Sequence, residues 1–404
     1  MNLAVRPDAL RSAAARLAGE VVDFAALRGS GPAYDALLVG ALHANPFHGR
    51  SVVEAHAAAG LLPERLRFLA ARDGGHLDAL LPFVPNGTFL GFRRAHRAWT
   101  PLHFSVDGTP LLTAAGAVAL AEAMAAAGPL WRLPLVAVDG GAGRALMAAC
   151  AERGFATEVL SSFDRPILEW RSGGYEAYAR AHLSRSRRKA LVRQWRRLHE
   201  AGRAAVASFA DGEGLRHAVE SFLTLEARGW KGRRGTALAS RPASAALARA
   251  LFTSSEGPVR GRADVLTLDG RPIAASLALV SRGTAYLLKT AHDETLRELS
   301  PGVLLEDAIL RAFLEEGFAQ KLDSASLPGG VLDDLYAGRE RIADLAVATD
   351  AGISPAALEA IAAQERRRTA ALAALKGWYW RAVDWTHAIR PSRPAASPSR
   401  RSRA

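Results

Sequence analysis

Residues 221–238, SFLTLEARGWKGRRGTAL, contain side chains that could carry out acid–base chemistry. An apolar stripe with helical spacing runs into Glu226, and a basic, glycine-rich turn containing Trp230 and Lys231 follows it. A carboxylate at the end of an apolar helix is a candidate general base, or a group that orients an amine. The alternative is a salt bridge from Glu226 to Lys231 or Arg228. Trp230 is expected to form a wall of the pocket, and Lys231 is a candidate substrate contact.

A second group of polar side chains lies in LLKTAHDE, residues 287–294. Asp293 is the second candidate for the base, and His292 is a candidate substrate contact. Lys289 stands among apolar neighbours, and a lysine in such a strand needs an anionic partner. It could bind an anion of the substrate or coenzyme. It could instead pair with Asp323 in the next predicted strand, which is itself a candidate substrate contact.

Three consecutive strands between residues 263 and 294 are expected to position these side chains. The dipeptides Asp-Gly at 269–270 and Arg-Gly at 282–283 are typical of tight hairpins. The segment 273–280 is almost wholly apolar, so it should be a central strand covered on both faces. Tyr286 lies three residues before Lys289, so the two side chains should point to opposite faces unless a bulge intervenes.

The segment SPGVLLEDAILRAFLEEGF predicts a helix that could bind an anion at its N-terminus. Ser300 is the expected N-cap, Pro301 is the first helical residue, and Gly302 has no side chain to block approach. Free backbone N–H groups and the positive end of the helix dipole would then face the ligand. A short strand and a turn, QKLDSASLPGG, follow.

The motif LExxGWKGRxGTAL resembles the CelD-like branch of the GNAT acyltransferase superfamily, which is related to the FemAB peptidyltransferases. Three strands, an N-capped helix and a further strand also follow the order of the GNAT core. The resemblance implies that the pyrophosphate of acyl-coenzyme A binds at residues 300–302. It also implies an oxyanion contact from the backbone of a splayed central strand, at Leu287, Leu288, Lys289 and Thr290. The sequence has ETLRELSPG in place of the usual Q/R-x-x-G-x-G/A loop, so the identity of the acyl donor stays open.

Residues 34–170 alternate predicted strands and helices, which is typical of an α/β unit. In size this unit is similar to the first, degenerate module of tandem FemAB-type proteins. Its NPFHGRSVVEA segment resembles the start of the first module of CelD-like proteins, where that segment lines the cleft between modules. His48 could therefore meet a substrate, or it could be a surface residue at the start of a helix.

A basic helix is expected between the two modules. Residues 183–203 carry eight lysines and arginines, with Leu191, Trp195 and Leu198 at helical spacing. Such a helix could be a solvated connection, contact an anionic substrate or coenzyme, or touch RNA or a membrane surface. Similar segments connect the two halves of CelD-like proteins. Residues 390–404 add five arginines in a Pro/Ser/Ala-rich context that is expected to be disordered.

Length and composition limit the class of protein. The chain has 404 residues, a formal net charge of +12 and a single cysteine, Cys150, so no internal disulfide can form. We expect that cysteine to be a buried structural thiol, and the His and Cys spacing predicts no metal site. Neither an apolar run long enough to span a membrane nor a signal peptide is recognised, which predicts a cytoplasmic location.

We therefore predict an α/β (α+β) protein with two tandem GNAT-like modules, a basic connecting helix and a C-terminal helical extension. The C-terminal helices carry an aromatic cluster that could touch a membrane interface or pack onto its own domain. The expected divisions are an N-terminal extension (1–33), a degenerate first module (34–170), a basic linker helix (171–203), an acyltransferase module (204–346), C-terminal helices (347–389) and a basic tail (390–404).

The predicted activity is that of an acyl-CoA-dependent N-acyltransferase, with acetyl-CoA or another acyl-CoA as co-substrate and no metal. The acceptor is expected to be a small molecule, glycan or peptide with an amine or hydroxyl, and the resemblance suggests a link to exopolysaccharide, cellulose or cell-envelope biosynthesis. Two alternatives stay open. One is a FemAB-like transferase that uses aminoacyl-tRNA, the only nucleic acid expected as a partner. The other is a non-catalytic accessory protein of polysaccharide synthesis. The basic tail could also contact a membrane surface.

Overall fold

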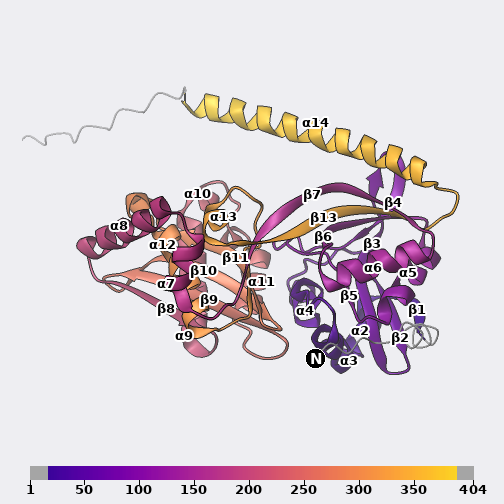
Figure 1. Ribbon diagram of the computed structural model, residues 1–404, viewed down its shortest axis with the longest axis horizontal. Coiled ribbons are helices and arrows are strands. Elements are labelled where there is room, and N and C mark those ends of the chain that lie inside the picture. Colours follow the sequence, from indigo (N-terminus) through magenta and orange to yellow (C-terminus); the bar gives the residue numbers. More distant parts are fainter. Residues whose placement is uncertain (1–16, 389–404) are drawn as a thin grey trace, which may run out of the picture.

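The first half of the described chain contains seven strands with helices between them (Figure 1). The computed structural model describes residues 17–388, with side chains up to residue 372. The strands are β1 (Ala18–Val22), β2 (Arg67–Asp73), β3 (His76–Leu90), β4 (Arg93–Ala98), β5 (Leu111–Leu112), β6 (Leu130–Ala137) and β7 (Ala156–Glu169). The helices are α2 (Phe24–Arg28), α3 (Gly31–Gly40), η1 (Pro46–His48), α4 (Arg50–Ala58), α5 (Gly116–Ala127) and α6 (Gly141–Glu152).

The second half follows the same alternation and ends in a long helix. Its strands are β8 (Ala204–Phe209), β9 (Val259–Leu268), β10 (Arg271–Ser281), β11 (Thr284–His292), β12 (Lys321–Asp323) and β13 (Gly338–Ala348). Its helices are α7 (Gly174–His182), α8 (Arg185–Ala201), α9 (Gly212–Arg228), α10 (Trp230–Arg233), η2 (Leu238–Ser240), α11 (Pro242–Phe252), η3 (Glu294–Leu299), α12 (Pro301–Glu316), α13 (Val331–Leu335) and α14 (Pro355–Ala388).

The described strands form one continuous sheet. Their order is β1-β2-β3-β4-β6-β13-β7-β12-β11-β10-β9-β8, with β5 paired to β3. Each half contributes one parallel pair, β4 with β6 and β11 with β12, and the other pairs are antiparallel. Read from its outer edge inward, each half thus has the same strand order, which is the two-module GNAT-like arrangement predicted from the sequence.

The two halves exchange their last strands at the centre of the sheet. Strand β13 of the second half lies beside β6 of the first, and β7 of the first half lies beside β12 of the second. The two long strands also pair with each other, from Gly338 opposite Ile167 to Ala348 opposite Ala156, and both cross the middle of the molecule in Figure 1. Because neither half completes its sheet alone, the two halves form one folded body.

The hairpins of the second half form where the sequence predicted them. Asp269 and Gly270 have φ of 50° and 78°, and Arg282 and Gly283 have φ of 43° and 77°. Positive φ at both central residues is the geometry that a two-residue hairpin requires. Strand β10 between them is almost completely buried, as its apolar sequence predicted for a central strand.

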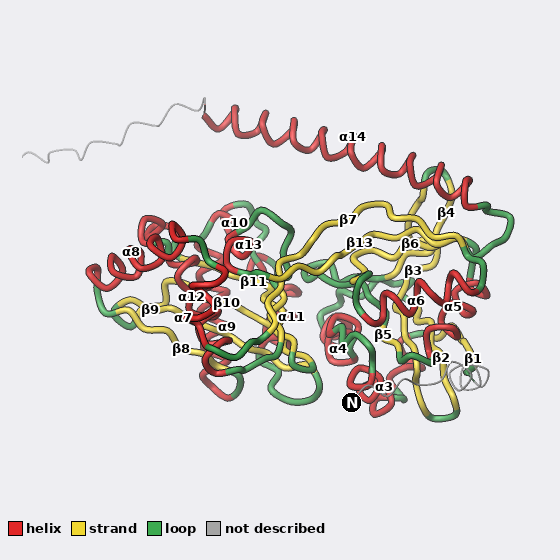
Figure 2. Tube along the Cα trace, viewed as in Figure 1, coloured by secondary structure: helices red, strands yellow, loops and turns green. Residues whose placement is uncertain are grey.

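Helices cover both faces of the sheet in each half (Figure 2). In the second half, α9 and α11 pack on one face, and α7, α8 and α12 pack on the other. The α9 face shares its core with the first half. The Phe47 ring lies 5.5 Å from the Tyr286 ring, and the Phe104 ring lies 5.4 Å from the Phe252 ring. These aromatic contacts close the boundary between the halves.

Two expected divisions of the chain need correction. Strand β1 pairs with β2 along its whole length, so the described part of the expected extension 1–33 belongs to the first module. The expected linker helix is two helices, α7 and α8, and both pack on α12. The Tyr175 hydroxyl donates to Asp307 Oδ1 at 2.6 Å, and Trp195 Nε1 donates to Asp307 Oδ2 at 2.8 Å. These helices therefore form a wall of the second core rather than a free connection.

Helix α14 runs along one side of both halves (Figure 1). Its first part is tied to the sheet by Arg132, whose guanidinium pairs with Glu365 at 3.0 Å and with Asp344 at 3.1 Å. The side chains of the aromatic cluster near the end of α14 and the basic tail lie outside the described residues. No helix within residues 17–388 is long and apolar enough to cross a membrane.

Cys150 is buried and free, as expected, and burial raises the pKa of its thiol to about 11. Over the same described residues, no group of three or more His, Cys, Asp or Glu side chains is arranged to hold a metal ion.

Candidate functional site

The parallel strands β11 and β12 separate after three residue pairs. The ladder runs from Thr284 opposite Lys321 to Tyr286 opposite Asp323, while β11 continues to His292 beside β10. The chain leaves β12 in a tight turn, in which the Ala325 N–H donates to Asp323 Oδ1 at 2.7 Å and Ala325 has a φ of 50°. Beyond Tyr286, no described strand pairs with the β12 side of β11. The gap lies beside residues 287–290, where the resemblance implied a splayed strand.

A β-bulge in β11 changes the direction of Lys289. Leu277 of β10 lies opposite Lys289, but the next residue, Ala278, lies opposite Leu287, so Leu288 is the extra residue. As a result Tyr286 and Lys289 lie on the same face of the sheet. The Tyr286 ring packs on Phe47, and Lys289 Nζ lies 5.5 Å from the centroid of the Phe104 ring. The sequence analysis expected opposite faces unless a bulge intervened, and the structure contains that bulge.

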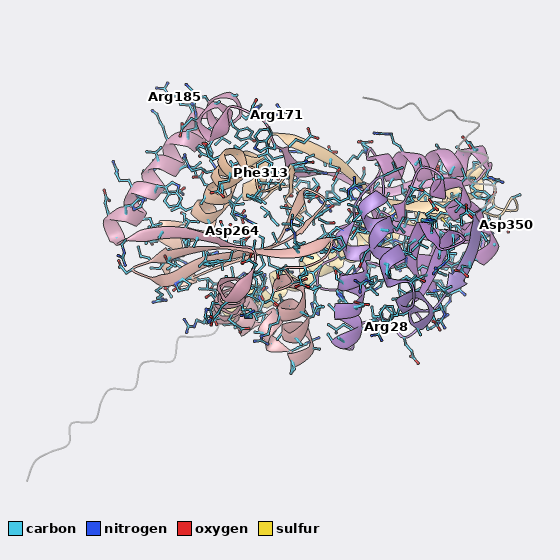
Figure 3. The ribbon with its side chains drawn as sticks, turned by 90° about the horizontal axis from the view of Figure 1, so that it is seen from below. Arg28, Arg171, Arg185, Asp264, Phe313 and Asp350 are labelled. Atoms are coloured by element: carbon cyan, nitrogen blue, oxygen red, sulfur yellow. The ribbon has the colours of Figure 1, made fainter. Side chains whose placement is uncertain are left out.

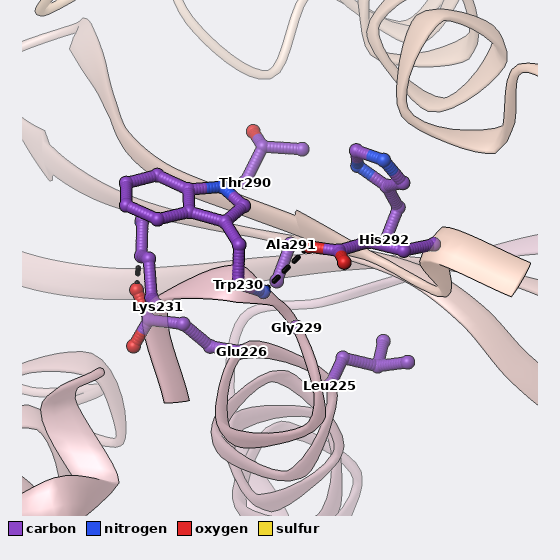
Figure 4. A pocket seen from close by; sticks show the side chains of 9 residues that line it. Leu225, Glu226, Gly229, Trp230, Lys231, Thr290, Ala291 and His292 are labelled. Carbon is purple, nitrogen blue, oxygen red and sulfur yellow. Dashed lines mark hydrogen bonds and ion pairs between the residues drawn. The ribbon is translucent and has the colours of Figure 1, made fainter. Parts of the chain in front are cut away.

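A small pocket lies where the end of α9 meets the end of β11 (Figure 4). It brings together the two segments that the sequence singled out, the Glu226 motif and the KTAHDE stretch. The pocket is lined by Leu225, Glu226, Gly229, Trp230, Lys231, Thr290, Ala291, His292 and Glu294.

Glu226 is buried and fully engaged. Lys231 Nζ donates to Oε1 at 2.8 Å, and the Leu238 N–H donates to Oε2 at 2.8 Å. The structure therefore contains the salt bridge that the sequence left open as an alternative. Because both carboxylate oxygens already have donors, Glu226 fixes Lys231 and the η2 turn in place.

Glu294 links α10 to the end of β11, a role that the sequence analysis missed. Its Oε1 accepts from the Trp230 N–H at 2.6 Å, and its Oε2 pairs with Arg233 Nη2 at 2.7 Å. The hydrogen bond from Arg233 lowers the pKa of the Glu294 carboxyl. The link holds the Trp230 indole, which is half exposed, over the pocket as Figure 4 shows. Glu294 follows directly after Asp293, so the acidic pair at 293–294 was the sequence feature that could have identified it.

Asp293 caps the short helix η3 and does not line the pocket. Its Oδ1 accepts from the Thr295 hydroxyl at 2.6 Å and from the Thr295 N–H at 3.0 Å, and its Oδ2 pairs with Arg271. The hydrogen bond from Thr295 and the ion pair lower the pKa of this carboxyl. The prediction of Asp293 as a second base is therefore not supported by its position, whereas its neighbour His292 does line the pocket.

The N-terminus of α12 lies next to His292. Pro301 is the first helical residue, as predicted, but Ser300 has a φ of 55° and its side chain does not cap the helix. Instead the Ser300 hydroxyl accepts from Gln194 Nε2 of α8 at 3.1 Å. The atoms nearest to a Cβ built on Gly302 would belong to the His292 ring, with Nδ1 at 3.1 Å. His292 thus connects the pocket with the start of α12.

A buried carboxyl lies beneath Thr290, on the α12 face of β11. The Thr290 hydroxyl donates to Glu306 Oε1 at 2.6 Å, while the buried Oε2 has no partner among the described residues. Burial raises the pKa of Glu306 to about 7. The buried Tyr336 hydroxyl also lacks a partner there, and burial raises its pKa, with the nearby Glu306 adding to the effect. The acidic pair at 306–307 within an apolar helical run was the sequence signal for this feature.

Two predicted substrate contacts are core residues. His48 is completely buried, with Nε2 2.9 Å from the Trp99 carbonyl oxygen, and burial lowers its pKa. It therefore lies neither in a pocket nor on the surface. Asp323 is also buried, where burial raises its pKa, and it lies 3.5 Å from Arg165 Nη1. The expected pair between Lys289 and Asp323 is absent, and Asp323 instead pairs with Arg165 and accepts from the Ala325 N–H.

One face of α8 forms a basic stripe along about three turns (Figure 3, in which Arg185 marks its start). Trp195 and Gln194 tie the opposite side of α8 to α12 and Ser300, so the stripe faces outward near the start of α12. Among its cations, the ion pair found within the described residues is Arg196 with Glu200, at 3.5 Å. The stripe consists of Arg185, Arg188, Lys189, Val192, Arg193 and Arg196.

Residues 185–325 match the model of the acetyltransferase (GNAT) domain family, which supports the GNAT-like fold predicted for the second half. A comparison with the curated proteins gives no match. The crystal structure of FemX is similar with a TM-score of 0.52 at 11% identity, over 80% of this chain and 96% of FemX, which shows the fold alone. The finer, CelD-like assignment stays a prediction.

Two further solved structures resemble the chain at lower TM-scores. L-PGS from Bacillus licheniformis has a TM-score of 0.46 at 12% identity, over 84% of this chain and 97% of that protein. A tandem GNAT protein from the clavulanic acid biosynthesis pathway has a TM-score of 0.39 at 13% identity, over 82% of this chain and 99% of that protein.

Proposed function

We propose, on the premise of a GNAT acetyltransferase domain in residues 185–325, that the chain transfers an acyl group from acyl-CoA to an amine or hydroxyl acceptor. One observation carries the proposal. The gap between β11 and β12 and the N-terminus of α12 both lie next to His292, which lines a pocket. A thioester in the gap and its phosphates at the helix would therefore bring the acyl carbon close to an acceptor in the pocket.

In this proposal the donor is held by backbone groups. The pyrophosphate accepts hydrogen bonds from the first free N–H groups of α12, next to Gly302, where the helix dipole favours negative charge. Backbone N–H groups of β11 beyond Tyr286, which lack a partner strand on that side, stabilise the oxyanion of the thioester carbonyl. No side chain of the usual superfamily loop is needed for either contact.

The acceptor reacts from the pocket side. Its nitrogen attacks the acyl carbon, the carbon–sulfur bond breaks, and the thiolate takes a proton from water. We assign the proton of the attacking amine to the His292 imidazole, because this side chain lines both the pocket and the start of α12. Glu226 acts as a positioning residue that holds Lys231 and η2, and Trp230 covers the acceptor.

Calorimetric titration of acetyl-CoA tests the donor site. The variant Gly302→Asp places a carboxylate where the pyrophosphate would bind, so we expect affinity to fall by about 1–3 kcal/mol with an unchanged melting temperature. Gly75→Asp is the matched control, because Gly75 lies in the β2–β3 turn, where a Cβ would point into open space. Equal affinity in both variants would place the donor elsewhere and overturn the proposed site.

The basic stripe of α8 favours a second candidate, a transferase that uses aminoacyl-tRNA. Its outward cations lie near the same helix start and could bind phosphates of an RNA 3′ end. Charge reversal by Arg188→Glu and Arg193→Glu should then weaken tRNA binding by tenfold or more and flatten its salt dependence. Binding of tRNA without acetyl-CoA supports this candidate. Binding of neither donor supports the third, a non-catalytic accessory protein of polysaccharide synthesis.

A further inference from the structure

Lys289 projects into the boundary between the two halves. The bulge at Leu288 turns its side chain toward the first-half loop at residues 101–110, where Nζ lies 5.5 Å from the Phe104 ring. Burial lowers the pKa of the Lys289 ammonium, and the nearby Lys231 lowers it further. This lysine is therefore a partly buried cation near Glu226 and Lys231 of the pocket.

The charges that act on Lys289 are those of Lys231 and Glu226, one of each sign. Burial lowers the pKa of His103, and the charges of Lys289 and Arg241 lower it further, which places these three groups together. The acid that acts on both Lys289 and His103 is Glu226, and its two oxygens are already engaged. Neither Lys289 nor Arg241 forms an ion pair with any residue in the described range.

A partly buried cation without an anionic partner is unfavourable. The contact with the Phe104 ring offsets only part of such a cost. The bulge is a local departure from regular pairing, and it places the ammonium in this position. A ligand that brings an anionic group to Lys289 would supply the missing partner.

The anion belongs to the acceptor rather than to the donor. The start of α12, where the donor phosphates bind in the proposed function, lies on the face of the sheet that Thr290 and Glu306 occupy. Lys289 points to the other face, which carries α9, Phe104 and the rest of the first-half boundary. A group at Lys289 therefore enters from the boundary between the halves, on the same side as Glu226 and Lys231.

We propose that Lys289 binds a carboxylate or phosphate of the acceptor, so that the substrate class is an amine or hydroxyl compound with an oxyanion a short distance from its reacting atom. This inference rests on the proposed function for the identity of the acceptor. The anion site itself does not depend on transfer, so the two can be tested separately.

The first experiment measures anion binding without any reaction. Lysines are labelled with ¹³C-methyl groups, and the Lys289 signal is identified by its loss in Lys289→Met. Acetate and inorganic phosphate are then titrated at constant ionic strength against sodium chloride. We expect a saturable shift of the Lys289 signal with at least one of the two oxyanions and none with chloride. Lack of any saturable shift overturns the anion site.

The second experiment measures transfer from acetyl-CoA to amino acids and to their uncharged amides. For Lys289→Met we expect the KM of the carboxylate acceptors to rise about 10–100-fold with little change in kcat. The amides should be unaffected, and Lys289→Arg should restore part of the loss. Arg65→Met, a change of an exposed cation in the loop between α4 and β2 that does not line the pocket, is the control.

The outcomes separate the two proposals. Equal loss with carboxylates and amides overturns the role of Lys289 in anion recognition. A saturable shift together with no transfer to any acceptor keeps the anion site and contradicts the proposed function. Folding is checked by the melting temperature, which should be unchanged or higher in Lys289→Met because a partly buried charge is removed.

Discussion

The two halves of the sheet share a strand order but treat the gap between their parallel strands differently. In the first half, β4 and β6 pair only at His96 and Arg97. The loop that follows then folds back onto β6, where the Gly108 N–H donates to the Leu135 carbonyl oxygen at 2.9 Å. In the second half, the chain after β11 turns away into η3 and leaves the edge of β11 without a partner strand.

The helices after these strands differ in the same way. A Cβ built on Gly116, the first residue of α5, would lie 2.1 Å from the Asp78 carbonyl oxygen. At the start of α12, the atoms nearest to a Cβ on Gly302 would belong to the movable ring of His292, at 3.1 Å. The start of α5 is therefore packed against backbone, whereas the start of α12 is packed against a side chain that can move.

The comparison shows that the same strand order can either leave a gap for a ligand or fill that gap with its own loop. The first half fills its own gap and lends its loop to the second half, where Phe104 lies next to Lys289 and Phe252. In the second half the gap stays unfilled, and the Phe104 loop of the first half packs beside it. We therefore expect all donor binding and chemistry in the second half.

The largest effect should come from a test that separates the roles of His292 and Glu226, which both line the pocket. His292→Gln removes the proposed base, so the transfer rate should fall by about 10² to 10⁴ with unchanged affinity for acetyl-CoA. Glu226→Gln instead weakens the contacts to Lys231 and the Leu238 N–H. It should lower stability by about 1–3 kcal/mol while the folded fraction keeps its turnover.

Steady-state kinetics and chemical denaturation of the same two variants check this separation. A rate loss in Glu226→Gln at full stability, with little change in His292→Gln, would reverse the two roles.

A pH-dependent effect should distinguish α12 from α5, whose buried residues are uncharged. Burial raises the pKa of Glu306 to about 7 from 4.5, so the folded protein holds this proton more tightly than the unfolded chain does. The stability from this group is complete below pH 4.5 and is lost as the pH rises to about 7. Relative to Glu306→Gln, the wild type should lose roughly 3 kcal/mol across that range.

Denaturant unfolding of both proteins from pH 4.5 to 8 gives the difference, which cancels the opposing titration of buried histidines such as His48. A difference that stays constant with pH would show that Glu306 is ionised in the folded protein.

The smallest effect should come from the matched glycines at the two helix starts. Gly116→Ala introduces a clash with the Asp78 carbonyl and should lower stability by about 1–3 kcal/mol. Gly302→Ala should leave stability unchanged or raise it by up to about 1 kcal/mol, because alanine favours the helix and His292 can move. Thermal melts compare the two. Equal destabilisation would mean that the start of α12 is packed as tightly as that of α5.

Much of the second half could be predicted because its signals are local. Periodicity and turn dipeptides predicted β9 to β11 and the hairpins, and Pro301 was correctly expected to begin α12. The prediction that the Ser300 side chain caps α12 was wrong, because its hydroxyl accepts from Gln194, which is distant in sequence. His48 was assigned to the cleft by resemblance, but the packing of Trp99 and Tyr34 buries it, and a local pattern cannot report that.

The sequence by itself predicted most of the helices and strands of the second half, because helical stripes and hairpins depend on neighbouring residues. It also identified the segments that contain Glu226 and His292 as candidate parts of one site. Tertiary structure alone decided what each side chain does. The exchange of β7 and β13 joins the halves, and the bulge at Leu288 turns Lys289 toward Phe104. The backbone N–H of Leu238 donates to the second carboxylate oxygen of Glu226. These outcomes depend on which distant groups come within hydrogen-bonding or packing distance, and this is fixed only when the sheet is complete.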